Sequence, residues 1–447
     1  MDVPQTGTKT LIVGLGKTGL SCARFLAARG MEIAVTDSRE RPPNLQALRN
    51  EVPNAAVFVG GFSETALQHA DQLVVSPGVS TNTPFVKQAR SMGMPVLGDI
   101  ELFARNVQSP VVAITGSNGK STVTTLVGAM AEQAGRDVRV GGNLGTPALD
   151  LIAADEPDLY VLELSSFQLE ITESLHCTAA TVLNVSPDHM DRYATVGDYA
   201  DAKARIFRHC QVAVVNRDDA LVRNMATAAA KQVSFGLNAP AAGDYGVVSK
   251  GATRWLMRGD VPLLAETEMR LRGDHNLLNA LAALALGAAA GLPMDSMLNT
   301  LRQFRGLPHR MEFVMHLNGA DWFDDSKATN VGATVAAVSG LPGPLVLIAG
   351  GDGKSQDFAP LATALQGKTR MAILLGKDAA AIEAAFGGKI TVRPVNDMPG
   401  AVRAAAEVAQ AGDTVLLSPA CSSLDMFENF EHRGREFQQA ARRLADG

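Results

Sequence analysis

Short runs of β-branched and aliphatic residues alternate along the chain with Ala-rich segments of helical length. This alternation is typical of doubly wound α/β folds, in which helices cover both faces of a parallel sheet. The runs fall into three series, and Gly- and Pro-containing segments near residues 98 and 306 have the composition of interdomain hinges. The pattern therefore predicts three α/β domains, over residues 1–98, 99–306 and 307–447.

The same pattern predicts individual elements. The first series predicts a helix over about 17–29, and the second predicts an Ala-rich helix after His275 and another helix before Arg305. The strands that we expect in the three series are Thr10–Val13 and Glu32–Thr36, then Val111–Thr115, Leu159–Leu162, Ala180–Leu183 and Val212–Val215, and finally Leu345–Ala349, Met371–Leu375 and Thr414–Ser418.

Composition and charge exclude some functions. Hydrophobic residues make up 46% of the chain and charged residues 19%, which is ordinary for a globular protein. The chain has 40 Lys and Arg residues against 46 Asp and Glu residues, for a formal charge of −6, and it lacks the basic block that marks a nucleic-acid binder. We therefore expect no nucleic-acid partner, and small anionic ligands must be held by local groups.

Three features favour a cytoplasmic location. The first ten residues lack the basic and apolar regions of a signal peptide. The longest apolar stretch, Leu277–Leu292, contains Asn279 and is shorter than the ~20 residues of a bilayer span, so we expect a buried helix and no membrane insertion. The cysteines are too scattered for a metal or redox motif, and we expect reduced, buried thiols at Cys22, Cys177, Cys210 and Cys421.

The segment Gly14–Gly19 has the spacing of a dinucleotide-binding loop. It follows the first predicted strand and opens the first helix, where glycines permit a tight turn and close approach of a pyrophosphate to the helix N-terminus. Asp37 ends the second strand and completes the fingerprint. From these residues alone, the loop could bind NAD, bind another nucleotide or form a structural turn.

The strongest local motif is Thr115–Thr122, TGSNGKST, between an apolar strand and a helix. Backbone N–H groups of such a loop contact phosphate oxygens, Lys120 can reach the β/γ-phosphates, and the Ser121 hydroxyl can bind Mg²⁺. The loop is shorter than the standard P-loop, because Ile114 stands where that spacing requires glycine. We predict that it binds nucleotide phosphates, with a structural turn as the alternative.

Further polar residues lie at or beyond two strand ends. Glu163 follows a predicted strand, where a carboxylate beside a P-loop usually holds Mg²⁺, although it could instead lie at a helix N-terminus. His189, in the segment NVSPDHMD, is the histidine best placed to bind a metal or phosphate, with a capping or core role as the alternative. Lys203 lies in a predicted helix, and spacing alone predicts a solvated surface lysine there.

Several later loops are dense in small, polar and charged residues. Asn276 and Asn279 lie one helical turn apart and could read an adenine edge or cap a helix. Each remaining loop could be an ordinary turn, but together they predict a cleft shared by the second and third domains. These loops are PHR at 308–310, DDSKATN at 324–330, GGDGK at 350–354 and SPACSSLD at 418–425.

With these motifs in this order along its whole length, the sequence resembles the Mur ligases, the ATP-dependent enzymes that add amino acids to peptidoglycan precursors. The residues on which this resemblance rests are GSNGKST at 116–122, the Glu163 and His189 segments, His275-Asn276 with Asn279, and His309-Arg310. The later loops, at 325–330, 350–354 and 418–427, are most similar to those of the members that add D-glutamate. The resemblance implies an α/β protein with a Rossmann-like N-terminal domain, a central P-loop ATPase-like domain and a Rossmann-like C-terminal domain.

The resemblance also implies the ligands. UDP-N-acetylmuramoyl-L-alanine would bind the first domain, so that Asp37 would not indicate NAD, ATP would bind the second, and D-glutamate would bind the third, where two carboxylates need cationic and hydroxyl partners. It revises Lys203 to a carbamoylated lysine that binds Mg²⁺. The implied residues are Gly14, Thr18, Ser38, Arg39, Gly78 and Asn143 for the UDP substrate; Gly116, Ser117, Asn118, Gly119, Lys120, Ser121, Thr122, Asn276, Asn279, Arg310 and Asp325 for ATP; Thr329, Lys354, Ser423 and Phe430 for D-glutamate; Ser121, Glu163, His189 and Lys203 for Mg²⁺; and Lys120, Glu163, His189 and Lys203 for catalysis.

The implied activity is ATP-dependent ligation of D-glutamate through an acyl phosphate, by a monomer whose third domain closes about the hinge at 306–308. Two other classes explain parts of the chain. A nicotinamide-dependent dehydrogenase would explain Gly14–Gly19 but leaves the Lys120 loop without a task, and a P-loop switch or regulatory ATPase does not explain the third domain. Within the family, an L-alanine-adding ligase or a folate-directed polyglutamate ligase is the nearest competitor.

Overall fold

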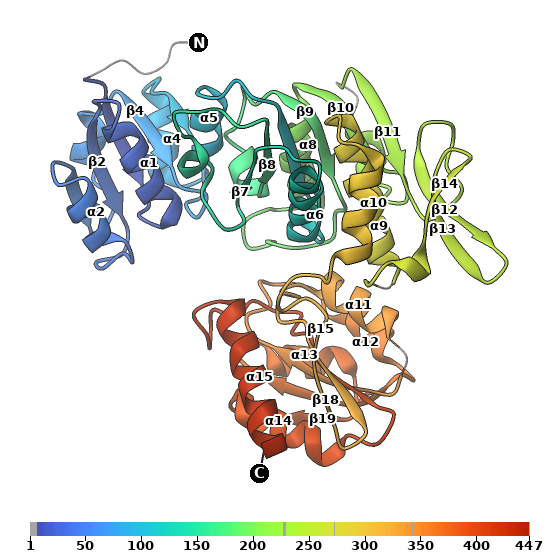
Figure 1. Ribbon diagram of the computed structural model, residues 1–447. Helices are drawn as coiled ribbons and strands as arrows, with labels where there is room; N and C mark the ends of the chain where they lie inside the picture. The colour runs from blue at the N-terminus through green and yellow to red at the C-terminus, as the bar shows by residue number, and fades with distance from the viewer. Residues whose placement is uncertain (1–6, 227–228, 272, 342, 447) are drawn as a thin grey trace. The chain divides into compact units, whose positions relative to one another are not determined.

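The computed structural model describes residues 7–226, 229–271, 273–341 and 343–446, and its elements are labelled in Figure 1. The predicted lack of a signal peptide concerns the first ten residues, of which residues 1–6 lie outside the described part. The described residues form two compact units. Unit 1 takes its residues from Met1–Val185, Gly197–Glu268 and Leu278–Arg302, and unit 2 takes its residues from Ser186–Val196, Met269–Leu277 and Gln303–Gly447.

The first sheet of unit 1 is parallel and has the strand order β3-β2-β1-β4-β5. Leu11 and Val13 of β1 pack into one hydrophobic cluster and Ile12 packs into another, so both faces of the sheet are covered, as parallel sheets require. The strands are β1 (Lys9–Val13), β2 (Glu32–Asp37), β3 (Ala56–Val59), β4 (Gln72–Val75) and β5 (Val96–Leu97), and the helices are α1 (Lys17–Ala27), α2 (Leu45–Glu51), α3 (Glu64–Gln68) and α4 (Pro84–Ser91).

The second sheet of unit 1 has the strand order β14-β13-β12-β11-β10-β9-β6-β8-β7. Its strands are parallel from β7 to β12, whereas β13 and β14 are antiparallel additions that the sequence pattern did not predict. The strands are β6 (Val111–Thr115), β7 (Val138–Gly142), β8 (Leu159–Glu163), β9 (Cys177–Val182), β10 (Cys210–Asn216), β11 (Lys231–Phe235), β12 (Tyr245–Lys250), β13 (Thr253–Arg258) and β14 (Val261–Ala265).

The helices near the second sheet include the predicted apolar one. That helix is α9, whose side chains from Leu277 to Leu286 are largely buried, which confirms the expectation of a buried helix. Among the described residues, no helix has the length and hydropathy to cross a membrane. The helical elements here are α5 (Asp99–Ala104), α6 (Lys120–Gln133), η1 (Ala148–Leu151), α7 (Ser166–Leu169), α8 (Val196–Ala204), η2 (Arg205–Phe207), η3 (Val222–Asn224), η4 (Glu266–Glu268), α9 (Asp274–Ala289) and α10 (Met294–Gln303).

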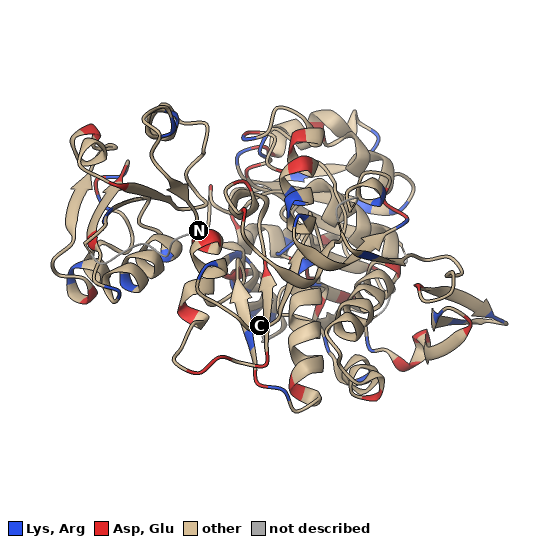
Figure 2. Ribbon diagram, turned by 90° about the horizontal axis from the view of Figure 1, so that it is seen from above, with Lys and Arg blue, Asp and Glu red and all other residues tan. Residues whose placement is uncertain are grey.

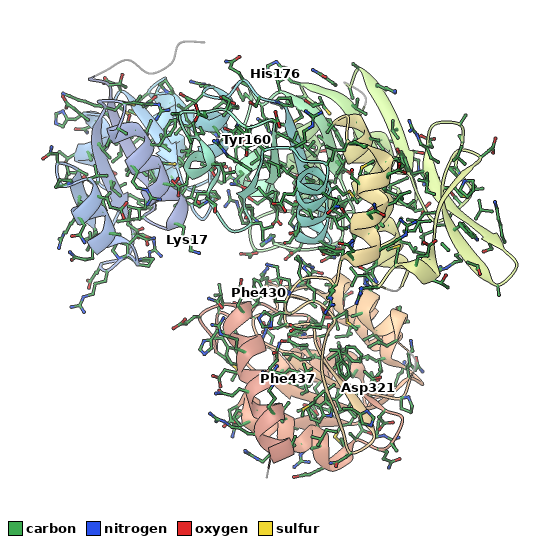
Figure 3. All side chains as sticks on the ribbon, in the orientation of Figure 1. Lys17, Tyr160, His176, Asp321, Phe430 and Phe437 are labelled. Atoms are coloured by element: carbon green, nitrogen blue, oxygen red, sulfur yellow. The ribbon has the colours of Figure 1, made fainter. Side chains whose placement is uncertain are left out.

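The sheet of unit 2 has the strand order β15-β16-β20-β17-β18-β19 and is parallel except at β15. Alternate residues of β17 enter two clusters, one beneath α11, α12 and α13 and the other beneath α14 and α15. Phe437 of α15, labelled in Figure 3, stacks on Trp322 in the second cluster. The elements are β15 (Glu312–Leu317), β16 (Ala320–Asp324), β17 (Leu345–Gly350), β18 (Thr369–Leu375), β19 (Val392–Pro394), β20 (Thr414–Leu417), α11 (Val331–Gly340), α12 (Ala359–Leu365), α13 (Ala379–Phe386), α14 (Met398–Val408) and α15 (Phe430–Asp446).

Every strand predicted from the hydrophobic pattern is present within a few residues of its expected position. The four cysteines are buried and unpaired, as expected. Basic and acidic residues are interspersed along the ribbon (Figure 2). The domain boundaries stay a prediction, because the segments 186–196 and 269–277 cluster with unit 2 although they precede residue 306 in the sequence.

Candidate active site

The glycine-rich loop connects β6 to α6 in unit 1. Gly116 and Gly119 have φ of 149° and 85°, which L side chains rarely adopt, so the loop needs glycine at both positions. Lys120 is the first residue of α6, and its Nζ donates to the carbonyl oxygens of Gly116 at 2.8 Å and Ser117 at 2.9 Å. The lysine side chain is therefore folded back onto the loop that the sequence motif predicts to bind nucleotide phosphates.

Asn184, which follows β9, holds this loop. Its carbonyl oxygen accepts the N–H of Ser117 at 2.9 Å, its Oδ1 accepts the N–H of Asn118 at 2.8 Å, and its Nδ2 donates to the carbonyl of Asn118 at 3.0 Å. No role for Asn184 was predicted from the sequence. Its position two residues beyond a strand that neighbours β6 is the signal that could have indicated one.

Lys203 on α8 is buried, with 1% of its surface exposed. Its Nζ donates to the carbonyl oxygen of Gly116 at 2.9 Å and lies 4.3 Å from the ring centroid of Tyr199. The interpretation of Lys203 as a solvated lysine is therefore wrong. Helical spacing could not identify the buried face of α8, because that face packs against a loop 87 positions away in the sequence.

Glu163 ends β8 and pairs in register with Ile114, just before the glycine-rich loop. It is 3% exposed, and its Oε1 accepts Asn143 Nδ2 at 2.7 Å. Its Oε2 is buried and has no hydrogen-bond partner among the described residues. A buried carboxylate oxygen without a donor is costly, which fits a position that a hard cation would fill.

The structure brings together part of the implied Mg²⁺ set. Ser121, Glu163 and Lys203 belong to unit 1, around the β6–α6 loop. His189 belongs to unit 2, where it has a φ of 58° and its Nε2 lies 3.6 Å from Oδ2 of its neighbour Asp188. Its participation with the other three residues stays a prediction.

The loop after β1 has the geometry of a nucleotide-binding turn. Gly14 has a φ of 92°, and a Cβ on Gly19 would lie 2.0 Å from the Gly14 carbonyl oxygen. Oδ2 of Asp37 accepts a hydrogen bond from the N–H of Leu15 at 2.7 Å and forms an ion pair with Nη2 of Arg39 at 2.6 Å. Burial alone would raise the pKa of Asp37, but the bonds from Arg39 and Leu15 outweigh it and lower the pKa to about 2.

The other implied UDP-substrate residues lie in unit 1. Ser38 and Arg39 follow β2 and are exposed, and Thr18 is half-buried in the first turn of α1. Gly78 lies in the exposed loop after β4. Asn143 follows β7, and its amide holds Glu163. The structure thus places these residues after strands of two neighbouring sheets, and their contact with a UDP substrate stays a prediction.

The implied D-glutamate residues lie on connected loops of unit 2. The backbones of Asp352 and Ser422 exchange hydrogen bonds, which joins the Lys354 loop to the Ser423 loop. Ser326 Oγ donates to the carbonyl of Phe430 at 2.8 Å, at the start of α15 where Figure 3 labels that residue. Thr329 is half-buried in the loop after β16, just beyond Ser326. Loops that follow β16, β17 and β20 therefore meet at one edge of the sheet.

A buried arginine and an ion pair complete this region. Arg433 is 2% exposed and donates to Ser326 and to the carbonyl of Cys421, so it fastens two of the loops. Lys354 Nζ lies 3.1 Å from Oδ1 of Asp188. Asp188 lies in the NVSPDHMD segment but had no predicted role, and its pairing with Lys354 joins segments 166 positions apart.

The implied ATP residues beyond the loop are divided between the units. Asn279 lies against the loop in unit 1, since a Cβ on Gly119 would be 2.5 Å from its Oδ1. Asn276, Arg310 and Asp325 belong to unit 2. Burial raises the pKa of Asp325 to about 7, although Ser418 Oγ donates to its Oδ2 at 2.8 Å.

The fold and the loop define a nucleotide-binding α/β protein with a P-loop-like ATPase region between two Rossmann-like regions. Three family models match the chain in order: the Mur ligase MurD-like N-terminal domain over residues 8–98, the Mur ligase middle domain over 114–287 and the Mur ligase glutamate ligase domain over 309–421. The chain belongs to the Mur ligase family, as the sequence motifs indicated.

Similar proteins cover nearly the whole chain. The UDP-N-acetylmuramoylalanine--D-glutamate ligase of Nitrosococcus oceani is 53% identical over 443 residues, covering 99% of this chain and 98% of its own length. The protein of the same name from Pseudomonas aeruginosa is 52% identical over 439 residues, covering 97% of this chain and 98% of its own length.

Solved structures show the same fold at low sequence identity. The UDP-N-acetylmuramate-alanine ligase of Thermotoga maritima has a TM-score of 0.62 at 18% identity and covers 98% of this chain and 100% of its own. The pseudomurein peptide ligase type C of Methanothermus fervidus has a TM-score of 0.62 at 17% identity, with the same coverage. These similarities confirm the predicted three-part α/β fold.

Proposed function

We propose that this chain is an ATP-dependent ligase that joins D-glutamate to the alanyl carboxylate of UDP-N-acetylmuramoyl-L-alanine, in peptidoglycan precursor synthesis. Relatives that carry this activity in their names are 53% and 52% identical to the chain over almost its full length. The observation that carries the proposal is the β6–α6 loop with Lys120 at the start of the helix, which supplies the phosphate-binding chemistry that such a ligase needs.

The first step activates a carboxylate. The alanyl carboxylate attacks the γ-phosphate of ATP, which forms an acyl phosphate and releases ADP. Lys120, whose Nζ donates to the Gly116 and Ser117 carbonyls, turns its ammonium to the β/γ-phosphates and offsets charge on the transferred group. Loop N–H groups orient the other phosphate oxygens.

The residues around the loop fit Mg²⁺. Oε2 of Glu163 is buried without a donor among the described residues, and the Ser121 hydroxyl lies in the first turn of α6. We infer that Ser121, Glu163 and a modified Lys203 of unit 1 hold the ion, whereas a contribution from His189 of unit 2 stays a prediction. When bound, Mg²⁺ would neutralise phosphate charge.

Lys203 fits the proposed modification. Its side chain is buried, and its Nζ shares the Gly116 carbonyl with the Nζ of the half-buried Lys120, so two amines donate to one oxygen. Burial penalises a charged ammonium. A neutral Lys203 amine that adds CO₂ forms a carbamate and releases a proton, and the carbamate offers the oxygen ligands that Mg²⁺ prefers.

The second step forms the amide bond. The amine of D-glutamate attacks the acyl phosphate carbonyl, and the tetrahedral intermediate collapses to amide and phosphate with loss of a proton. We propose that Lys354, Thr329, Ser423 and Phe430 bind D-glutamate, because their loops meet at one sheet edge and present one ammonium and two hydroxyls. Two carboxylates need such partners.

The test is phosphate release by the purified chain with ATP, Mg²⁺ and UDP-N-acetylmuramoyl-L-alanine while the amino acid is varied. We expect release to depend on D-glutamate and to be low with L-alanine or L-glutamate. Release without any amino acid would indicate a regulatory ATPase instead, and NAD binding without a response to the UDP substrate would indicate a dehydrogenase. We also propose a monomer that acts in the cytoplasm, to be checked by light scattering and cell fractionation.

A further inference from the structure

Asp99 is a buried carboxylate at the junction after the first sheet of unit 1. It is the first residue of α5 and is 2% exposed. The chain enters this helix through Gly98, where a Cβ would lie 2.9 Å from Ile171 Cδ1, so the junction is packed tightly against the segment after α7. Burying a carboxylate costs free energy unless a specific interaction compensates for it.

The specific interaction of Asp99 is with Gln168. Oδ2 accepts a hydrogen bond from Gln168 Nε2 at 2.8 Å, whereas Oδ1 is buried without a hydrogen-bond partner among the described residues. Gln168 is itself 3% exposed, so its amide is held between protein groups. The thiol of Cys22 on α1 also lies near enough to the Asp99 carboxylate to interact with it electrostatically.

Gln168 closes the N-terminal end of α7. Its Oε1 accepts from the N–H of Ser165 at 3.0 Å and from Ser165 Oγ at 3.1 Å, while its own N–H donates to Ser165 Oγ at 3.2 Å. This reciprocal capping box requires the amide oxygen to face Ser165. A carboxylate can accept a hydrogen bond from the NH₂ end of the Gln168 amide but not from its oxygen end, so Asp99 selects that orientation of the amide.

Ser165 lies two residues after Glu163. The segment between them is held at Leu164, whose N–H donates to the Ile114 carbonyl, and Glu163 is held by Asn143. The Gln168 amide is therefore connected, through its hydrogen bonds to Ser165, to the backbone that carries the proposed Mg²⁺ ligand. Groups that orient metal ligands typically change metal affinity or activity by ~10–100-fold when they are removed.

We propose that Asp99 is a positioning residue for the phosphoryl-transfer site, acting through the Gln168–Ser165 capping box to fix the Glu163 segment. The proposal rests on the proposed function, because it takes Glu163 as a Mg²⁺ ligand. It connects the beginning of α5 to the active site through two hydrogen-bonded side chains.

The first test uses hydrogen–deuterium exchange of the nucleotide-free, Mg²⁺-free enzyme. Asp99→Leu removes the acceptor, and we expect faster amide exchange across residues 163–169. Asp99→Asn keeps one acceptor oxygen, and we expect it to restore most of the protection. Glu101→Gln is the matched control, since Glu101 lies on the same helix with 2% exposure but binds Ser174, Glu173 and Arg105 instead.

The second test measures the Mg²⁺ concentration for half-maximal phosphate release and uses a double-mutant cycle. We expect Asp99→Leu and Gln168→Leu each to raise that concentration by ~10-fold or more, and the double variant to show no further increase. Glu101→Gln should leave it near the wild-type value, even if it lowers the melting temperature.

The outcomes separate the two proposals. Unchanged exchange over 163–169 in Asp99→Leu, additive effects in the cycle, or faster exchange with an unchanged Mg²⁺ requirement would each overturn the positioning role. If Glu163→Gln leaves the Mg²⁺ requirement unchanged, the assignment of Glu163 in the proposed function fails, whereas the exchange measurement still reports on the connection from Asp99 to α7. If Asp99→Leu does not fold, the exchange and Mg²⁺ measurements on Asp99→Asn and Gln168→Leu test the proposal instead.

Discussion

At the scale of single residues, three of the side chains with proposed roles are buried ionisable groups. Glu163, Lys203 and Asp99 are each at most 3% exposed. A buried ionisable group without a specific role lowers stability, since the charged form loses hydration. Substitutions at these residues therefore test whether each group is kept for activity, because a group with no role in activity could be replaced without loss of activity.

Lys203 allows a test by chemical rescue. Lys203→Ala should lose most of the activity, because the oxygen ligands of the carbamate are missing, and a small carboxylate such as acetate should restore part of it by entering the vacated space. Lys203→Arg should not be rescued, because guanidinium does not form the carbamate and still fills the space. Phosphate release with and without acetate measures this. Full activity of Lys203→Ala without acetate would contradict the role.

Lys354 allows a test of amino-acid binding. Lys354→Ala should raise the KM for D-glutamate by ~10-fold or more and change the KM for ATP little, because a dicarboxylate loses a charge-assisted partner worth ~1.5–3 kcal/mol. Lys377→Ala is the control, since Lys377 is an exposed lysine of the same sheet edge that pairs with Asp352 at 3.2 Å. A rise confined to the KM for ATP would indicate that Lys354 binds the nucleotide and not D-glutamate.

Asp37 predicts a pH dependence of stability. The folded-state pKa, lowered to about 2, lies below the unfolded value, so the interaction stabilises the fold above about pH 4 and is lost as the pH falls towards 2. Asp37→Asn should lower the free energy of unfolding by about 2 kcal/mol at pH 7 and by much less near pH 2. Urea unfolding at both pH values measures this, with the exposed Asp71→Asn as the control. A difference that does not depend on pH would contradict the ionic origin.

At the scale of elements, the start of α1 depends on the absence of one side chain. Gly19 lies so close to the Gly14 turn that a Cβ would be 2.0 Å from the Gly14 carbonyl, whereas a Cβ on Gly16 would meet nothing within 4 Å. Gly19→Ala should cost ~3 kcal/mol in the free energy of unfolding, at the upper end for an overpacked site, and Gly16→Ala, at the N-cap of α1, should cost ~1 kcal/mol or less. Equal effects in urea unfolding would show that the turn relaxes.

Elements were predicted well where the hydrophobic pattern was continuous. Strands such as Val111–Thr115 are buried on both faces and read as short apolar runs between glycine-rich turns. The strands β13 and β14 were not predicted, because exposed and polar residues interrupt their apolar positions, as in the burial pattern of Thr253–Arg258. The other strands that were not predicted are β3, β4, β5, β7, β11, β12, β15, β16 and β19, among which the short β4 is fully buried. β13 pairs with the edge of β12, and β14 pairs with β13. The hydrophobic pattern within one segment does not show which other strand it pairs with.

Site residues were predictable when a motif carried them. Lys120 follows from the loop spacing, whereas the burial of Lys203 depends on a contact 87 positions away and the Asp99–Gln168 bond joins residues 69 positions apart. Such long-range contacts become visible only when the strands are ordered in the sheets. The family resemblance supplied the Lys203 assignment that spacing alone could not give.

At the scale of the whole molecule, we expect a change of shape during the reaction. Water would hydrolyse the acyl phosphate, so the amino-acid-binding region should close over the nucleotide before chemistry. Gly306, in the predicted hinge, has a φ of 93° that few other residues adopt. Small-angle scattering should show a smaller radius of gyration with a non-hydrolysable ATP analogue and UDP-N-acetylmuramoyl-L-alanine together than with neither. An unchanged radius of gyration would contradict the expected closure.

The composition of unit 2 has a consequence for synthesis on the ribosome. Its segments 186–196 and 269–277 leave the ribosome long before residues 303–447, which form the rest of the unit. At ~5–20 residues per second, the wait for the early segment is on the order of tens of seconds. During that time Asp188 lacks its partner Lys354, and polar and apolar surface of the segment stays available to chaperones and proteases. A chain that terminates before residue 303 never supplies those partners, so a nonsense product should be degraded rather than accumulate as a folded nucleotide-binding fragment.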